Sequence, residues 1–201
     1  MTLPVQPPTP RPAHPLRRAL ATWGAIAALL WAVLLADLVL PAHLTQYGIT
    51  PRTLDGLVPG ILAAPFLHAD AAHLAANTVP LVVMGVICAL RDRRGMWTAL
   101  VFALVASGLG VWLVSPANSV TVGASGVAFG LLGYLLARGV FMRRIGDLLI
   151  ALLVFAVYGS LIWGVLPTSP YVSWQAHLFG FLGGIAAAIA VARARRSEAA
   201  A

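Results

Sequence analysis

The chain has 201 residues, of which 60% are hydrophobic and only 9% are charged, and its mean hydropathy is +0.90. These polar residues are too few to cover the surface of a water-soluble globular protein. The composition therefore predicts an integral membrane protein. The formal net charge of +7 comes from thirteen arginines, with no lysine, against six acids. These arginines stand in short clusters between apolar runs, which indicates membrane topology rather than a nucleic acid partner.

Cysteine and histidine usage gives no sign of a disulfide or a metal site. Cys88 is the only cysteine and lies in an apolar run, so we expect a small buried side chain. No pair of histidines has the spacing of a zinc motif; the five are His14, His43, His68, His73 and His177. We expect neither a metal nor a cofactor.

The first part of the chain predicts a tail and one membrane span. Residues 1–18 are rich in proline and arginine and are expected to form a disordered cytoplasmic tail. Residues 19–40 are apolar over the roughly 20 residues that a spanning helix needs. Asp37, near the far end of this run, is expected at the membrane interface, with a functional intramembrane acid as the alternative.

The next segment, 41–69, contains four prolines between short apolar pieces. It is too interrupted to span and too apolar to lie in water, so we expect it partly in the interface, with its backbone polar groups buried in protein or hydrated. A second helix is predicted from Asp70, a suitable N-cap, to about Leu90.

Four more apolar runs follow, and the arginines fix their orientation. The predicted helices cover 97–114, 123–141, 148–166 and 172–192, with a short basic tail over 193–201. If the arginine-bearing ends are cytoplasmic, twelve arginines lie inside and only Arg52 lies outside. The sequence therefore predicts an all-α protein, a six-helix transmembrane bundle over 19–192, with both termini cytoplasmic and a bacterial plasma membrane location.

Polar residues recur at one depth on three of these helices. The second, fourth and sixth helices all start on the non-cytoplasmic side, and their first turns carry His73 and Asn77, Ser125, and His177. Any one of these could be a hydrogen-bonded core residue. Their recurrence at the same level favours a hydrated cavity, because polar groups are costly in hydrocarbon.

Small residues predict which helices touch. Gly180 and Gly184 continue the face of His177, and Ser125 begins a run with Gly126, Gly130 and Gly133. Such faces let helix backbones approach closely, so the fourth and sixth helices are expected to pack together. For Gly123-Ala124-Ser125-Gly126 alone, close packing is the competing interpretation.

At these positions the sequence resembles the rhomboid family of intramembrane serine proteases. The resemblance covers about residues 60–190 and rests on Gly123-Ala124-Ser125-Gly126, on His177 with Gly180 and Gly184, and on His68, His73 and Asn77. It implies a six-helix bundle that cleaves peptide bonds in or near transmembrane segments of other membrane proteins. Phe129 stands where the family often has a tyrosine, and the first extracellular loop lacks the family's Trp-Arg pair.

The residue types suit acyl transfer by a dyad. Ser125 is expected as nucleophile, His177 as general base and then acid, and His73 and Asn77 as oxyanion donors, helped by the Ser125 amide. His68 is expected to shape the cavity. None of the six acids is placed to orient His177, so packing on Phe129 is expected to do so.

Two other functions remain open from sequence. A non-catalytic relative would keep the fold to bind transmembrane clients, although such relatives typically lack the serine or histidine that are present here. A small-solute transporter would need a polar path through the cytoplasmic halves of the second, fourth and sixth helices, which hold hardly a polar side chain. The expected partners are transmembrane substrates and the lipid bilayer; the oligomeric state is not indicated.

Overall fold

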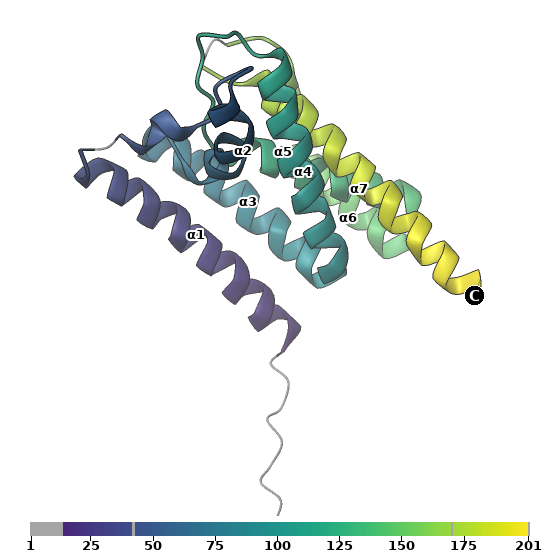
Figure 1. Ribbon diagram of the computed structural model, residues 1–201. Helices are drawn as coiled ribbons and strands as arrows, with labels where there is room; N and C mark the ends of the chain where they lie inside the picture. The colour runs from purple at the N-terminus through teal and green to yellow at the C-terminus, as the bar shows by residue number, and fades with distance from the viewer. Residues whose placement is uncertain (1–13, 42, 170, 201) are drawn as a thin grey trace, which may run out of the picture.

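The computed structural model describes residues 14–41, 43–169 and 171–200, and these ranges are helical apart from loops and one bridge between Ile49 and Thr121 (Figure 1). The elements in chain order are α1 (Pro15–Val39), η1 (Leu44–Tyr47), α2 (Leu54–Ala63), η2 (Ala64–Phe66), α3 (Ala71–Arg91), α4 (Arg93–Val114), α5 (Ser125–Phe141), α6 (Ile145–Tyr158), η3 (Gly159–Val165) and α7 (Trp174–Ala200). Five segments, namely α1, α3, α4, α6 with η3, and α7, are long and apolar enough to cross a membrane, whereas α5 has 17 residues. The chain is therefore an all-helical, multi-pass membrane protein.

Helix α5 is the centre of the bundle. It contacts α3, α4, α6 and α7, whereas α1 packs at the edge against α3 (Figure 1). Leu131, Leu132 and Tyr134, three residues on different sides of α5, are all fully buried. A helix that is buried all round belongs in a protein core, so Ser125, its first residue, is held by protein on several sides.

The predicted contact between the fourth and sixth helices is confirmed as the packing of α5 on α7. A Cβ atom on Gly180 would lie 2.0 Å from the Gly126 carbonyl oxygen, and one on Gly184 would lie 1.9 Å from that of Gly130. Neither distance leaves room for a side chain, so these glycines allow the two backbones to touch. This contact fixes the first turns of α5 and α7 beside each other.

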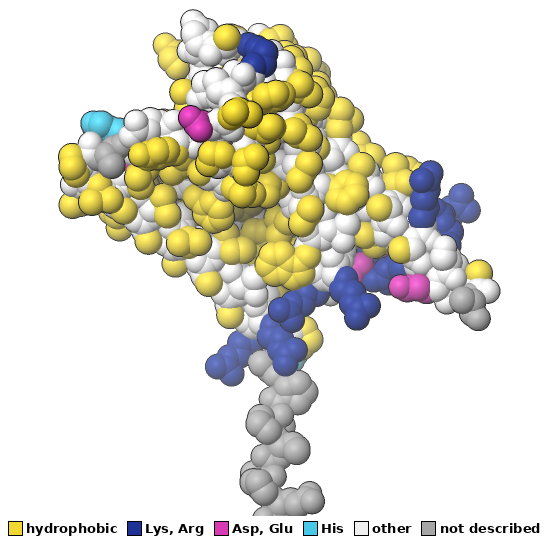
Figure 2. Space-filling model, in the orientation of Figure 1, with side chains coloured by type: hydrophobic (Ala, Val, Ile, Leu, Met, Phe, Trp, Pro, Cys, Tyr) yellow, Lys and Arg dark blue, Asp and Glu magenta, His cyan; other side chains and the backbone are white. Residues whose placement is uncertain are grey.

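The other end of the bundle, which we call the arginine end, is held by buried ion pairs. Arg138 Nε donates to Asp147 Oδ1 at 2.9 Å, and Arg91 Nε donates to the same oxygen at 3.0 Å. Asp92 accepts from Arg138 at 3.3 Å and from Arg195 at 2.6 Å. These pairs join the ends of α3, α5, α6 and α7, and most of the dark blue side chains in Figure 2 gather at this end.

Arg138 is buried, although an arginine near a helix end normally reaches water. It is in the last turn of α5 and only 2% exposed.

The pKa of Asp92, at the junction of α3 and α4, is set by opposing effects. Burial raises this pKa, but the Gly95 amide and the Arg195 guanidinium hold it below its ordinary value. The carboxylate therefore stays charged and keeps its partners.

Several predicted boundaries shift. Helix α1 begins at Pro15 rather than residue 19, because a proline is well suited to the first turn and the His14 side chain accepts from the Leu16 amide. Helix α7 continues to Ala200, so the segment 193–200, expected as a short basic tail, is helical. The predicted fifth helix is split, with α6 ending at Tyr158 and η3 continuing as a 3-10 helix. Of the disordered tail expected over residues 1–18, residues 15–18 are helical and residues 1–13 lie outside the described residues.

The connection before α3 is more structured than expected. It contains α2, whose N-cap Thr53 accepts from the Gly56 amide. The Ile49 amide donates to the Thr121 carbonyl at 2.9 Å and the reverse bond measures 3.0 Å. The Trp112 indole also donates to the Thr53 carbonyl at 2.8 Å. Protein groups therefore satisfy backbone polar atoms of this segment, one of the two alternatives expected from its sequence.

Candidate active site

A left-handed glycine sets the start of α5 and presents Ser125. Gly123 has φ +118°, so the helix begins at Ser125 rather than at residue 123. A Cβ atom on Gly123 would lie 2.9 Å from His73 Nε2 and 3.8 Å from Asn77 Nδ2. Glycine is therefore required both for the backbone turn and for the approach of the His73 ring.

Two hydrogen bonds hold the loop that leads into Ser125. The Gly123 amide donates to the Ala64 carbonyl at 2.8 Å, and the Ala124 amide donates to His68 Nε2 at 3.3 Å. Because Nε2 accepts here, His68 must be neutral. Burial, with a smaller contribution from the nearby His73, lowers the pKa of His68 to about 4, so the neutral ring is the stable form near neutral pH.

The Ser125 side chain is half-buried and available. Within the described part of the chain its hydroxyl has no hydrogen-bond partner. Its backbone amide, in the uncapped first turn of α5, has none there either. An unpaired hydroxyl and an unpaired N–H at a helix N-terminus form a site where negative charge is favoured.

His177 lies flat on Phe129. The two ring centroids are 4.0 Å apart and the ring planes differ by 6°. Phe129 follows Ser125 by four residues, so both project from the same face of α5. His177 itself is 8% exposed and comes from the first turn of α7. The expected aromatic support for the histidine is therefore present.

A backbone carbonyl orients the imidazole. His177 Nδ1 lies 2.9 Å from the carbonyl oxygen of Gly164, in η3. A carbonyl oxygen can only accept, so the proton is on Nδ1 and Nε2 is left as the basic nitrogen. No sequence pattern indicated this contact, since any residue has a carbonyl group. The only hint is the glycine itself, because a Cβ there would lie 2.9 Å from Phe129 Cζ and 3.1 Å from His177 Nδ1.

His73 and Asn77 flank the same loop from α3. Asp70 caps α3 by accepting from the His73 amide at 2.7 Å, and Asn77 Nδ2 donates to the His73 carbonyl at 3.1 Å. The Asn77 amide keeps one further N–H. The rings of His68 and His73 meet edge to face with centroids 5.1 Å apart. The three predicted residues His68, His73 and Asn77 are thus brought together around Gly123 and Ala124.

The Ser125 hydroxyl and the His177 imidazole do not form a hydrogen bond with each other in this structure. Among the described residues, neither the Ser125 hydroxyl nor His177 Nε2 forms a hydrogen bond. The two turns still touch, because a Cβ on Gly126 would lie 3.2 Å from the Ala176 carbonyl oxygen. Catalytic hydrogen bonds are often long without substrate and tighten when it binds.

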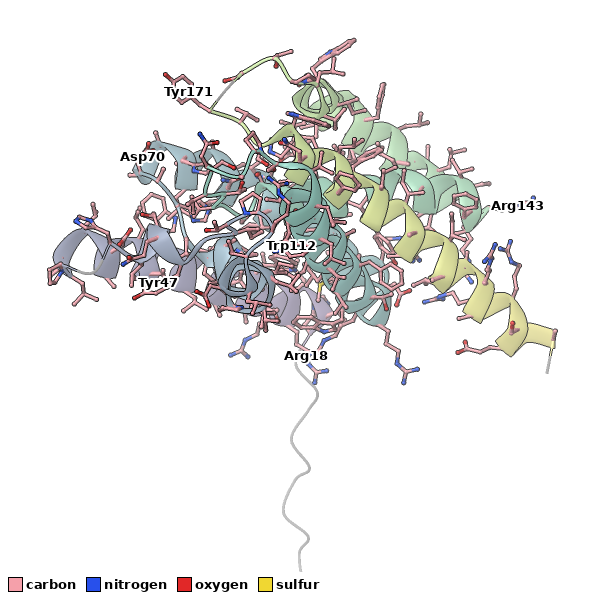
Figure 3. The ribbon with its side chains drawn as sticks, turned by 45° about the horizontal axis from the view of Figure 1, so that its top comes forward. Arg18, Tyr47, Asp70, Trp112, Arg143 and Tyr171 are labelled. Atoms are coloured by element: carbon pink, nitrogen blue, oxygen red, sulfur yellow. The ribbon has the colours of Figure 1, made fainter. Side chains whose placement is uncertain are left out.

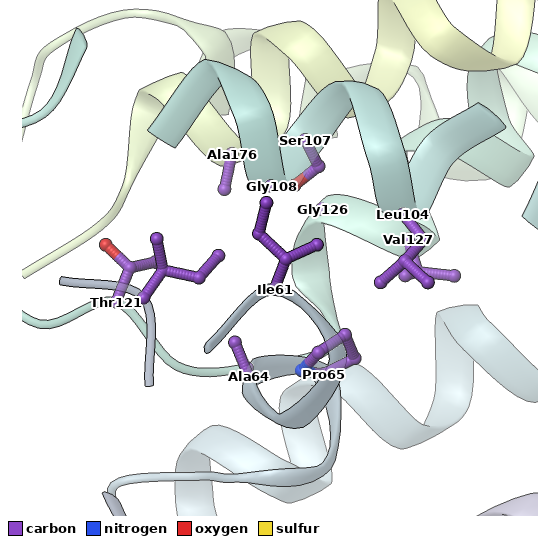
Figure 4. A pocket seen from close by; sticks show the side chains of 12 residues that line it. Ile61, Ala64, Pro65, Leu104, Ser107, Gly108, Thr121, Gly126, Val127 and Ala176 are labelled. Atoms are coloured by element: carbon purple, nitrogen blue, oxygen red, sulfur yellow. The ribbon is translucent and has the colours of Figure 1, made fainter. Parts of the chain in front are cut away.

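A small cavity lies directly behind the serine turn. Its volume is about 20 Å³, and its lining includes Gly123, Gly126, Ala176 and the Ser107 side chain (Figure 4). Such a space admits about one water molecule. Beside this cavity the serine turn lies against α4, because a Cβ on Gly126 would lie 2.0 Å from Ser107 Oγ.

The acids do not complete a triad. Asp70 is used as a helix cap, and Asp92 and Asp147 are paired at the arginine end. Figure 3 shows Asp70 and Tyr171 on the opposite side of the bundle from Arg18 and Arg143. Across residues 14–41, 43–169 and 171–200, no group of three metal-binding side chains occurs. The partner of His177 Nδ1 is the Gly164 carbonyl rather than any of these carboxylates.

Comparison with known proteins gives the family. The model of the Rhomboid domain matches residues 56–194. An uncharacterized protein of Mycobacterium tuberculosis is 42% identical over 171 residues, covering 80% of this chain and 70% of its own length. A Bacillus subtilis protein named as a candidate rhomboid protease is 31% identical over 172 residues, covering 77% and 81%.

A plant relative matches a shorter stretch. Rhomboid-like protein 11 of the Arabidopsis thaliana chloroplast is 39% identical over 71 residues, which is 35% of this chain and 25% of that protein. No solved structure matches the chain. The family match covers most of the chain and includes every residue of the candidate site, so the protein belongs to the rhomboid family.

Proposed function

We propose that the protein is an intramembrane serine protease that uses Ser125 and His177 as a catalytic dyad. The observation that carries this proposal is the orientation of His177, which stacks on Phe129 and uses Nδ1 for the Gly164 carbonyl. That leaves a basic Nε2 beside the turn that presents an unpaired serine hydroxyl. Family membership supports the same chemistry.

The reaction follows from these groups. Ser125 Oγ attacks a peptide carbonyl while His177 Nε2 takes its proton. The tetrahedral oxyanion accepts hydrogen bonds from the Ser125 amide and from the His73 and Asn77 side chains. His177 then protonates the leaving amine, and a water molecule activated by the same nitrogen hydrolyses the acyl-enzyme. Each step uses groups that already surround Gly123 and Phe129.

The length of α5 supports a recessed site open to water. Its 17 residues extend about 25 Å, which is less than the roughly 30 Å of a hydrocarbon core. With its last turn anchored at the arginine end, its first turn falls short of the opposite surface. Six crossings, cytoplasmic arginines and an active site open to the extracytoplasmic side of a bacterial membrane complete the proposal.

The substrate is a transmembrane segment with an unwound backbone. An intact helix keeps its carbonyls in its own hydrogen bonds, so cleavage needs helix-weakening residues near the cut. The recess is narrow, because Gly123 touches the His73 ring and Gly164 touches His177. A small side chain at the cleaved bond fits this confinement.

Labelling with a serine-directed fluorophosphonate tests the proposal. The wild-type protein in detergent is expected to be labelled and to cleave a transmembrane reporter, and Ser125→Ala is expected to lose both activities while keeping its thermal stability. Ser107→Ala is the matched control, since this serine lies beside Gly126 but is buried. Labelling and cleavage that persist in Ser125→Ala remove the protease proposal and favour a protein that only binds transmembrane clients.

A further inference from the structure

A second cavity lies at the arginine end, far from Ser125. It has a volume of about 160 Å³ and is formed by the start of α1, the end of α3 and the start of α4. Its lining includes Arg18, Thr22, Ala89, Arg93 and Met96. One water molecule needs only about 10–15 Å³, so this space admits a larger polar group.

The two arginines of this cavity are not neutralised. Among the described residues, neither Arg18 nor Arg93 forms an ion pair. The nearest acid in sequence, Asp92, already accepts from Arg138 and Arg195 and caps α4 through the Gly95 amide. Two exposed guanidinium groups therefore line a hollow without a protein anion.

Other features of the cavity favour an anion. Thr22 follows Arg18 by four residues, so its hydroxyl, which has no partner in the described ranges, projects from the same face of α1. Arg93, at the first position of α4, lines the same space. Donors from two helices thus converge on one space.

The residues around this cavity are of the kinds found at a membrane surface. Met96 is 1% exposed and forms an apolar floor beside Ala19. Trp97, four residues after Arg93, is 45% exposed, and tryptophan is enriched at the level of lipid headgroups. A ligand here would meet cations at one end and hydrocarbon at the other.

We propose that this basic cavity binds the phosphate of an anionic phospholipid headgroup. The planar guanidinium groups of Arg18 and Arg93 can each donate two parallel hydrogen bonds to phosphate oxygens. The Thr22 hydroxyl adds a donor, and the acyl chains run along the apolar surface below. Basic pockets between transmembrane helices on the cytoplasmic side suit such lipids.

Thermal unfolding followed by tryptophan fluorescence tests this site in the purified full chain in a neutral maltoside detergent. The titrants are phosphatidylglycerol, phosphatidylcholine and inorganic phosphate, since a ligand that binds the native state raises the Tm. We expect a saturable rise with phosphatidylglycerol only. The Arg18→Gln/Arg93→Gln variant should need at least about tenfold more of this lipid.

Arg193→Gln/Arg196→Gln is the matched control. It removes the same charge from two exposed arginines that are outside the cavity and form no ion pair within the described chain, and it should respond like the wild type. The proposed site is overturned if phosphatidylglycerol and phosphatidylcholine raise the Tm equally. It is also overturned if the two double variants weaken the response to phosphatidylglycerol equally. If inorganic phosphate gives a saturable rise in Tm and Arg18→Gln/Arg93→Gln abolishes that rise, the ligand is free phosphate. That result overturns the proposal of a lipid ligand. If the Arg18→Gln/Arg93→Gln variant does not fold, the same comparison is made between the single variants Arg93→Gln and Arg196→Gln.

Discussion

The imidazole of His177 lies parallel to the ring of Phe129, with centroids 4.0 Å apart, while its Nδ1 meets the Gly164 carbonyl oxygen at 2.9 Å. These two contacts come from different helices and restrict different motions. The stack fixes the plane of the ring, and the hydrogen bond fixes its rotation within that plane. Together they do for His177 what a carboxylate does in a triad.

Replacing the ring beneath the histidine should slow catalysis. Phe129→Leu keeps an apolar side chain but removes the stack, so His177 can tilt. We expect kcat for reporter cleavage to fall about 10- to 100-fold with little change in Tm, because small displacements of a catalytic group cost about that much. Phe155→Leu, at an exposed ring on α6, should leave kcat unchanged. Wild-type kcat in Phe129→Leu would show that the stack does not position the base.

A methyl group at residue 164 should disturb the same histidine from the other side. The Cβ of Gly164→Ala would lie 2.9 Å from Phe129 Cζ and 3.1 Å from His177 Nδ1, so the rings or η3 must move. We expect at least about a tenfold loss of kcat. Gly159→Ala is the control in the same 3-10 helix, because its Cβ would meet only the flexible Phe155 side chain at 3.1 Å. Similar activity in the two variants would argue against a positioning role for Gly164.

Removal of one oxyanion donor should lower kcat more than KM. Asn77→Ala deletes an amide close to Gly123 and should reduce kcat about 10²- to 10³-fold, the usual cost of one such donor. Asn118→Ala, in an exposed loop, should behave as wild type. Steady-state cleavage with a purified reporter separates the two constants. A change confined to KM would assign Asn77 to substrate binding.

The low pKa of His68 gives a pH dependence of stability. Its pKa is about 4 in the folded protein and 6.5 in its ordinary state, so the unfolded chain binds the proton more readily. This contribution is fully present above about pH 6.5 and is lost as the pH falls toward 4. The Tm of the wild type should therefore fall over this window, and His68→Gln, which cannot titrate, should fall less. His43→Gln, at an exposed position, should follow the wild type; parallel curves for His68→Gln and wild type would refute the link.

Breaking the buried pairs at the arginine end should destabilise the protein without touching the site. Arg138→Met leaves Asp147, which is 2% exposed, with only the partly exposed Arg91 as a partner. Removal of one member of a buried ion pair costs about 3–5 kcal/mol of unfolding free energy. Arg196→Met, at an exposed position, should change it by no more than about 0.5 kcal/mol. Equal stability of the two variants would mean that the pairs only orient the helices.

Much of the fold was predictable because hydrocarbon imposes strong patterns. Apolar runs near 20 residues gave the helices, and the glycines after Ser125 and His177 correctly predicted that α5 packs on α7. Helix ends were less accurate. The split between α6 and η3 depends on local hydrogen bonding near Gly159, which hydropathy does not report.

The candidate site was predictable only in its side chains. Ser125, His177, His73 and Asn77 are costly polar groups in apolar helices, so sequence singles them out. The Gly164 carbonyl could not be found in this way, because backbone groups have no residue signature. Arg138 was missed for a different reason: an arginine near a helix end normally reaches water, and only the fold brings Asp147 and Asp92 to it.

The ion pair between Asp92 and Arg195 has a consequence for biogenesis, because its partners are 103 residues apart in the chain. During synthesis Asp92 is inserted long before Arg195 leaves the ribosome. Until then the carboxylate has Arg138 and the Gly95 amide as partners but lacks Arg195. The order of synthesis therefore makes this ion pair one of the last contacts of the bundle to form.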